Sequence, residues 1–280
     1  METDLRAKTA GLLELVKAEQ PLVHHITNYV SANDCANTML AIGASPIMAD
    51  DSGEVADIVS LSAALVLNIG TLNARTISSM LKAGKKANAL GIPVVLDPVG
   101  AGATVLRSTT AEQLLRELKL AVIRGNLSEI KAVSGLGSAT RGVDVSAQDM
   151  LEAENPDYGR CIAEDLSSRF DCAVAITGAV DIVAGGGKTC FIENGHSMLS
   201  RVTGTGCMCT SLIAAYCAVT RDYPAAAAAG ILTMGLAGEL AYERLPEADR
   251  GPGTFRVKLL DALSRIIGED ILKRGRVREG

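Results

Sequence analysis

The stretch that decides the fold is residues 64–130, where short apolar segments alternate with longer helical ones. The apolar segments read ALVLNI at 64–69, VVL at 94–96 and LAVI at 120–123, and the intervals carry helical patterns at 72–90 and around 110–118. Strands that alternate with helices at this spacing predict a parallel sheet with right-handed crossovers. Ligands bind beyond the carboxyl ends of the strands in such sheets. We therefore expect a functional edge formed by the loops at 68–71, 97–102 and 124–129.

The same alternation continues on both sides of this stretch. We expect a strand that starts at residue 22, strands at 45–48 and 173–176, a hairpin of 180–184 with 189–192, and helices at 3–19, 33–42, 53–61, 158–170, 224–244 and 255–267. Pro46 cannot donate to a ladder, so 45–48 is interpreted as an edge strand. Residues 135–157 are interpreted as a surface loop. Because we find no linker and no repeat, residues 1–280 are expected to form one α/β domain.

Composition excludes several classes of protein. Hydrophobic residues make up 48% of the chain but include no Trp and only three Phe, so Ala, Val, Leu and Ile must fill the core. The net charge of −5 argues against nucleic-acid binding, and the basic tail at 273–278 is interpreted as a solvated C-terminus. The seven cysteines lack disulfide spacing, and the N-terminus is charged, which favours reduced thiols in a cytoplasmic protein. Residues 202–220 are uncharged, but the glycines and threonines at their start favour a buried helix over a membrane span.

Residues 203–207 read TGTGC and lead directly into the uncharged run. A helix that begins there presents unpaired backbone N–H groups and the positive end of its dipole. The glycines 204 and 206, on either side of Thr205, let an anion approach the backbone, so the turn is a candidate phosphate cradle. Cys207 lies in the first helical turn, where the same field favours a thiolate. The alternative is an ordinary tight turn that enters a core helix.

Four polar residues are expected on the same rim of the sheet. Asp97 ends an apolar strand and Glu129 lies near the start of a helix, and two carboxylates there fit Mg²⁺. Arg124 ends its strand, where a guanidinium can clamp phosphate oxygens, and Thr177 ends the strand at 173–176. The alternative roles are a turn-stabilising Asp, a capping Glu, a surface salt bridge and a simple strand-end turn.

A histidine pair, His24 and His25, precedes Asn28 in a strand that opens into a polar loop. Neighbouring residues on a strand point to opposite faces, so at most one histidine lines a given pocket. Packed or solvent-facing histidines are the favoured interpretation.

Six motifs in this order resemble the hydroxyethylthiazole kinase family of the ribokinase-like superfamily. They are HHITN at 24–28, GASPIM at 43–48, LNIGT at 67–71, DPVGA at 97–101, RGNLSE at 124–129 and TGTGC at 203–207. The resemblance covers about residues 10–265. It implies a three-layer α/β/α fold with a mostly parallel central sheet, and a homotrimer with active sites at subunit interfaces. The implied reaction is the ATP-dependent phosphorylation of 4-methyl-5-(2-hydroxyethyl)thiazole, a salvage step toward thiamine.

The resemblance also implies roles for single residues. Met48 and Gly204 match thiazole-contacting positions, and Asn28 is grouped with them as a substrate-binding candidate. Arg124 and Thr177 match ATP-contacting positions, and Asp97 and Glu129 match acidic positions associated with magnesium. Cys207 takes the place of the aspartate base of most ribokinase-like enzymes, at the end of a catalytic turn formed by Gly204, Thr205 and Gly206.

Two questions stay open at this point. Cys207 either accepts the proton of the alcohol or only orients it, because an ordinary thiol with a pKa near ~8.5 is mostly protonated at neutral pH. The function also has two alternatives. One is a related kinase that acts on another small alcohol, such as hydroxymethylpyrimidine. The other is a sensor that binds a phosphate ligand without catalysis, which the carboxylates 97 and 129 disfavour.

Overall fold

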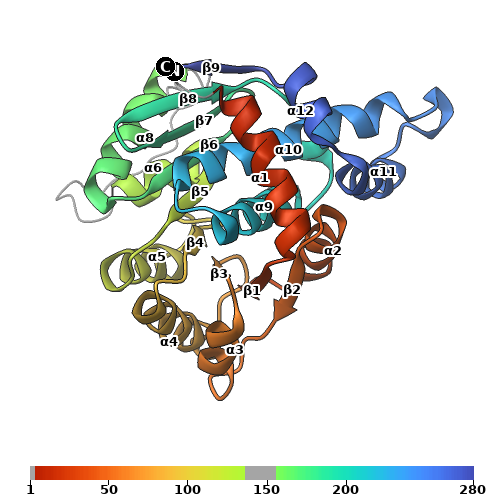
Figure 1. Ribbon diagram of the computed structural model, residues 1–280. Helices are drawn as coiled ribbons and strands as arrows, with labels where there is room; N and C mark the ends of the chain where they lie inside the picture. Colours follow the sequence, from red (N-terminus) through yellow and green to blue (C-terminus); the bar gives the residue numbers. More distant parts are fainter. Residues whose placement is uncertain (1–3, 136–155) are drawn as a thin grey trace.

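The computed structural model describes residues 4–135 and 156–280, and in this part of the chain all strands belong to one nine-stranded sheet (Figure 1). In spatial order the strands are β2 (Ser45–Met48), β1 (Leu22–Ile26), β3 (Ala64–Asn68), β4 (Val94–Asp97), β5 (Val122–Asn126), β6 (Ala173–Thr177), β7 (Asp181–Gly185), β8 (Lys188–Ile192) and β9 (Val277–Glu279). The first six pair in parallel and the last three are antiparallel. The mostly parallel sheet, the edge position of β2 and the β7–β8 hairpin confirm the sequence predictions.

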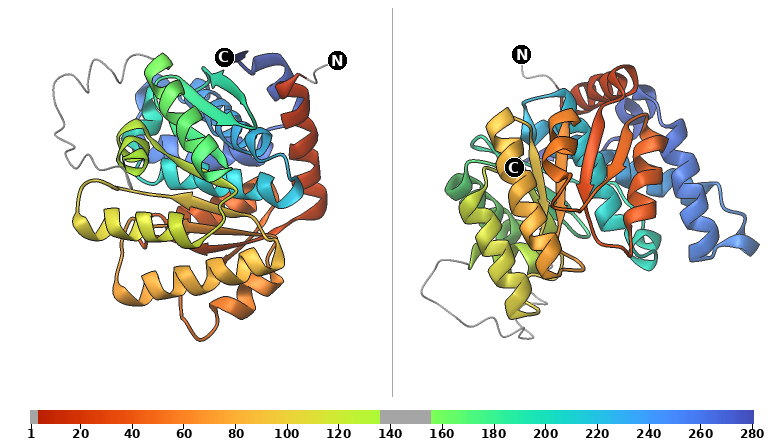
Figure 2. Two further views of the ribbon diagram at one scale, coloured as in Figure 1. Left: turned by 90° about the vertical axis from the view of Figure 1, so that its left-hand side faces the viewer. Right: turned by 90° about the horizontal axis from the view of Figure 1, so that it is seen from below.

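Helices cover both faces of the sheet and give three layers, α/β/α (Figure 1 and Figure 2). One face carries α1 (Leu5–Glu19), α2 (Ala32–Ile42), α9 (Thr205–Val219), α10 (Tyr223–Glu243), α11 (Pro252–Arg265) and α12 (Gly268–Arg274). The other carries α3 (Val55–Leu61), α4 (Ala74–Leu90), α5 (Val105–Glu117), α6 (Leu127–Ser134) and α8 (Pro156–Phe170). Successive residues of a strand point to opposite faces of the sheet. Val66 and Val95 pack in the core under the first set of helices, and Leu65 and Leu96 pack in the core under the second set.

The uncharged helices α9 and α10 form the centre of the first core. They approach closely because α10 is rich in Ala and Gly, and a Cβ added to Gly230 would lie 2.7 Å from the backbone nitrogen of Ile213. Among the described residues, α10 is the one helix long and apolar enough to cross a membrane, yet nearly all of it is buried inside the molecule. The prediction of a buried helix after the TGTGC turn is confirmed, with its first residue at Thr205.

Three sequence predictions need correction. The helix expected around 110–118 begins earlier, at Val105, because Thr104 caps it by accepting a hydrogen bond from the Arg107 N–H. The strand expected at 120–123 is shifted to Val122–Asn126, since its polar end pairs in register with β6. The tail is not simply solvated: β9 pairs with β8, and its arginines find acidic partners, such as Glu239 for Arg276. The loop expected at 135–157 lies almost entirely outside the described residues.

Candidate active site

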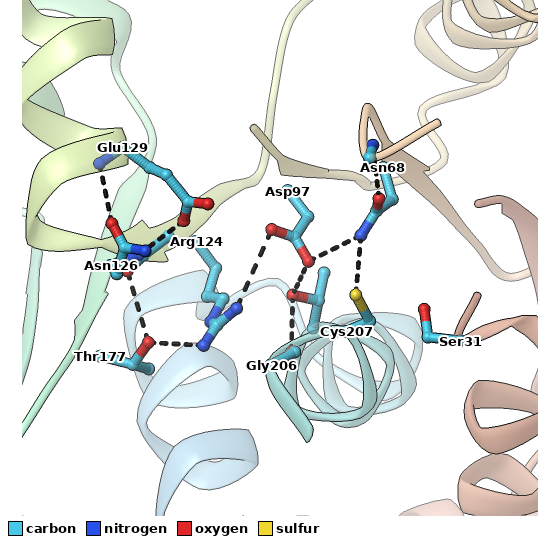
Figure 3. A network of polar contacts seen from close by, with 12 residues as sticks. Ser31, Asn68, Asp97, Arg124, Asn126, Glu129, Thr177, Gly206 and Cys207 are labelled. Carbon is cyan, nitrogen blue, oxygen red and sulfur yellow. Dashed lines mark hydrogen bonds and ion pairs between the residues drawn. The ribbon is translucent and has the colours of Figure 1, made fainter. Parts of the chain in front are cut away.

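The site is built around the N-terminus of α9, at the carboxyl ends of β3 to β6 (Figure 3). Gly204 caps the helix with φ of +87°, a conformation that favours glycine, and a Cβ there would lie 3.0 Å from the Ser31 Cβ. The first intrahelical bond runs from the Met208 N–H to the Gly204 oxygen, at 2.8 Å. The N–H groups of residues 205–207 have no acceptor within the described chain, so the turn has the free donors that an anion needs.

Arg124 reaches this helix start from the end of β5. Its Nη2 donates to the Thr177 Oγ1 at the end of β6, and its Nη1 lies 3.9 Å from the Asp97 Oδ1. A Cβ added to Gly206 would lie 2.7 Å from the same Nη1, so glycine is required for this approach. Both charged side chains are buried, with 10% of the Arg124 side chain exposed and none of Asp97. The structure therefore brings Arg124, Thr177 and Asp97 together, as the strand-end argument predicts.

Asp97 carries an unsatisfied oxygen. Its Oδ2 accepts hydrogen bonds from the Asn68 Nδ2 (2.9 Å) and the Thr210 Oγ1 (2.8 Å), whereas Oδ1 has no hydrogen-bond donor among the described residues. Burial raises the pKa of Asp97 to about 6, because the lowering effect of Arg124 offsets only part of the desolvation. A buried carboxylate oxygen without a donor is unusual and is suited to a cation.

The sequence suggested two roles for Glu129, a magnesium ligand or a helix cap, and the structure shows the cap. Its Oε2 accepts from the Asn126 N–H (2.9 Å), and the Asn126 Oδ1 accepts from the Glu129 N–H (2.9 Å), which is a capping box at the start of α6. Its Oε1 accepts from the Gly100 N–H (2.8 Å), so the carboxylate also holds the loop after β4. Each oxygen keeps a free lone pair, and a magnesium role stays a prediction.

Cys207 is enclosed by side-chain amides. Its Sγ lies 3.2 Å from the Asn68 Nδ2 and 3.3 Å from the Asn28 Nδ2, both of which donate to it. Burial raises the pKa of the thiol, and the neighbouring Asp97 raises it further. Desolvation of the charged form therefore opposes the thiolate that the helix end favours, and the role of Cys207, as a base or as an orienting group, stays a prediction.

Two cavities meet at Arg124 and Gly206, which line both of them. The smaller one, about 360 Å³, is lined on its other sides by Asn28, Ser31, Asp97, Glu129, Gly204 and Cys207, among others. The larger one, about 620 Å³, extends past Thr177 and Thr205 toward Asn194, His196 and Met234. The α9 N-terminus thus lies between two compartments of unequal size.

One predicted site residue lies apart from this cluster. Met48 ends the edge strand β2, is 38% exposed, and lines neither of the two cavities. Conversely, sequence reasoning missed Asn68 and Thr210, the two donors to Asp97. The sequence pattern could have indicated Asn68, because this residue ends β3 directly opposite Asp97 in the parallel register. No sequence pattern indicated Thr210, since it lies within an otherwise apolar helix.

His24 and His25 are both buried and packed, as predicted. His25 lies with its Nε2 3.0 Å from the Ser211 Oγ, and burial lowers its pKa to about 4. Between pH 4 and 6.5 the His25 imidazole is protonated in the unfolded chain but neutral in the folded protein. The contribution of neutral His25 to the free energy of unfolding therefore grows as pH rises. Compared with a His25→Gln variant, the wild type should gain up to about 3 kcal/mol of unfolding free energy across this window.

Urea unfolding of both proteins at pH 5 and pH 7.5 measures the part of this gain that lies above pH 5, about 2 kcal/mol. A difference in unfolding free energy that is the same at both pH values would contradict the prediction.

Solved structures with the same architecture identify the fold. A ribokinase-like superfamily protein from Enterococcus faecalis superimposes with a TM-score of 0.62 at 12% identity, over 92% of this chain and 95% of that one. This likeness shows that the chain has the same three-layer α/β/α fold as that protein.

Sequence comparison is more specific. The model of the hydroxyethylthiazole kinase family matches residues 13–269. The hydroxyethylthiazole kinase of Clostridium beijerinckii is 51% identical over 100% of both chains. A solved hydroxyethylthiazole kinase from Pyrococcus horikoshii has a TM-score of 0.86 at 40% identity, over 98% of this chain and 99% of that one. The chain belongs to the hydroxyethylthiazole kinase family.

Proposed function

We propose that this protein transfers the γ-phosphoryl group of ATP to the hydroxyl of 4-methyl-5-(2-hydroxyethyl)thiazole, in the salvage of thiamine. The observation that carries the proposal is the meeting of a larger and a smaller cavity at the free N–H groups of residues 205–207. A phosphoryl group that moves from one compartment to the other passes these donors, which stabilise the charge on its oxygens.

The larger cavity is the proposed ATP site. Arg124 and Thr177 lie at its inner end, where a triphosphate would reach the helix start. The guanidinium offers a planar fork of donors to phosphate oxygens. The cavity then extends to apolar and aromatic side chains such as Met234 and His196, which suit a nucleobase.

The smaller cavity is the proposed thiazole site, with Asn28, Gly204 and Cys207 in its wall. Met48 would reach a thiazole only from a neighbouring subunit, because it lies outside the cavity of its own chain. Next to Asn28, the loop residues Tyr29 and Val30 are 82% and 55% exposed. Exposed apolar side chains at the cavity mouth support a homotrimer in which adjacent chains complete each other's sites.

The donor set at the junction fits Mg²⁺, which prefers hard oxygen ligands and keeps several waters. The Oδ1 of Asp97 is buried and accepts no hydrogen bond from the described residues, and Asp97 and Glu129 both line the smaller cavity. When bound, Mg²⁺ neutralises phosphate charge. We assign Asp97 and Glu129 to hold it, directly or through water.

The transfer itself depends on alignment. Gly204, Thr205 and Gly206 place the free amides, and Arg124 lies beside them. Cys207 faces the alcohol, either as its base or to orient it; a raised pKa favours the neutral thiol at pH 7. We further propose that residues 1–280 act as one domain, supported by the single sheet through the described residues, and that the protein works in the cytoplasm.

A coupled ATPase-type assay tests the function. With Mg-ATP, we expect ADP to form when the thiazole alcohol is added, and to fall to background without Mg²⁺. Hydroxymethylpyrimidine under the same conditions serves as the matched alcohol and should be turned over poorly. Equal turnover of the pyrimidine would favour a broader kinase, and ATP that binds without being consumed would contradict the proposal.

A further inference from the structure

Asn68 is buried at 2% exposure and uses every hydrogen-bonding position of its side chain (Figure 3). Its Nδ2 donates one hydrogen to the Asp97 Oδ2 (2.9 Å) and the other to the Cys207 Sγ (3.2 Å). Its Oδ1 accepts from the Asn28 Nδ2 and the Gly70 N–H, both at 2.9 Å. A side-chain amide has two donors and two acceptor lone pairs, so it is saturated. Rotating the amide by 180° would place its oxygen against the Asp97 carboxylate, where two acceptors repel each other. Only one orientation of the Asn68 amide is therefore favourable.

Asn28 is saturated in the same way and is 5% exposed. Its Nδ2 donates to the Asn68 Oδ1 (2.9 Å) and to the Cys207 Sγ (3.3 Å). Its Oδ1 accepts from the backbone N–H and the hydroxyl of Ser31, both at 3.0 Å. The sulfur therefore receives one N–H from each of two amides whose orientations are set by their other partners.

This arrangement determines where the thiol hydrogen points. The sulfur of a neutral thiol is a weak acceptor, and two of its directions are taken by the amides. A third direction is left for the S–H bond, and Cys207 lines the smaller cavity together with Ser31. The Ser31 hydroxyl donates its hydrogen to the Asn28 Oδ1. Burial, which raises the pKa of Cys207, keeps the neutral form present.

We infer that Asn68, with Asn28, holds Cys207 as an S–H donor directed into the thiazole cavity, and that Asn68 is a positioning residue for phosphoryl transfer. The inference rests on the proposed function, and it assigns Cys207 to orientation of the alcohol. No bond to sulfur forms or breaks. Since the same Asn68 amide donates to Asp97, it also sets the distance between the thiol and the carboxylate on the phosphate side.

A double-mutant cycle on kcat tests the positioning role. One lost hydrogen bond is worth about 1–1.5 kcal/mol, so Cys207→Ala should lower kcat about 10-fold. Asn68→Ala, which loses bonds to both Asp97 and Cys207, should lower it roughly 100-fold. The double variant should be no worse than Asn68→Ala, because Asn68 acts on the alcohol through Cys207. Losses that multiply, or a Cys207→Ala loss of more than ~100-fold as for a lost base, would overturn the inference.

Asn37→Ala is the matched control, because among the described residues the Asn37 side chain bonds only to Asn33, within its own helix and at the surface. It should leave kcat and KM unchanged. A loss in the Asn37 variant similar to that of Asn68→Ala would show that the assay reports general destabilisation.

A spectroscopic measurement keeps the inference independent of turnover. The S–H stretching band of Cys207 is isolated as the infrared difference between wild type and Cys207→Ala. We expect a band at neutral pH that moves to lower frequency when the thiazole alcohol is added without ATP, and that changes in Asn68→Ala before any ligand is added. Absence of the band, or a band identical in Asn68→Ala, would refute the positioning of a neutral thiol. If the thiazole fails as a substrate but the Asn68→Ala difference persists, only the proposed function is wrong.

Discussion

Replacing Arg124 with alanine is expected to lower kcat by roughly 10³-fold, the low end for an arginine that faces a transferring phosphoryl group. The guanidinium lies where the two cavities meet, with Nη1 beside Gly206 and Nη2 bonded to Thr177. The low end applies because the free amides of α9 share the charge of the phosphoryl oxygens. Steady-state kinetics with ATP and the thiazole alcohol give kcat and both KM values.

Two companion variants separate catalysis from folding. Arg124→Lys keeps the charge but has no fork to contact Thr177 and a phosphate together, so an intermediate loss is expected. Arg75→Ala removes an exposed arginine whose ion-pair partners are Asp50 and Asp51, and its kinetics should match the wild type. If folded Arg124→Ala retained kcat within about tenfold of wild type, Arg124 would belong to the framework rather than to the reaction.

The second large effect is expected for Asp97→Asn, which should lower kcat by at least ~100-fold, because charge neutralisation by a bound metal supplies several kcal/mol. Asparagine has nearly the same shape, but it removes the negative charge and offers only one oxygen. The concentration of Mg²⁺ needed for half-maximal activity should rise with the loss of kcat. A magnesium titration at saturating ATP and thiazole alcohol measures both quantities.

Thr210→Val is the matched control for Asp97, because it removes one of the two hydrogen bonds to Oδ2 and leaves the carboxylate in place. A loss of about tenfold, as for one hydrogen bond, is expected with an unchanged magnesium requirement. If Asp97→Asn showed the magnesium requirement of the wild type, the assignment of Asp97 to the metal would be wrong.

The sequence was sufficient to predict which strand ends meet at the site. Asp97 and Thr177 each end an apolar strand, and parallel strands end at one edge, so their neighbourhood follows from topology alone. Arg124 lies on the same rim, although β5 extends past it to Asn126. The predicted end of β5 was too early because β5 continues to pair with β6 through polar residues. The hydrophobic pattern does not detect strand residues that are polar.

The sequence by itself determined the alternation of strands and helices, the mostly parallel sheet and the glycine-lined start of α9. These features depend on local periodicity and on the conformational freedom of single residues, which can be read within a short window. Tertiary structure alone decided the burial of Cys207, the lack of a hydrogen-bond donor to the Asp97 Oδ1 and the link through Asn68. Those depend on burial and on partners 139 positions apart, as Asn68 and Cys207 are, and only the packed chain brings them within hydrogen-bonding distance.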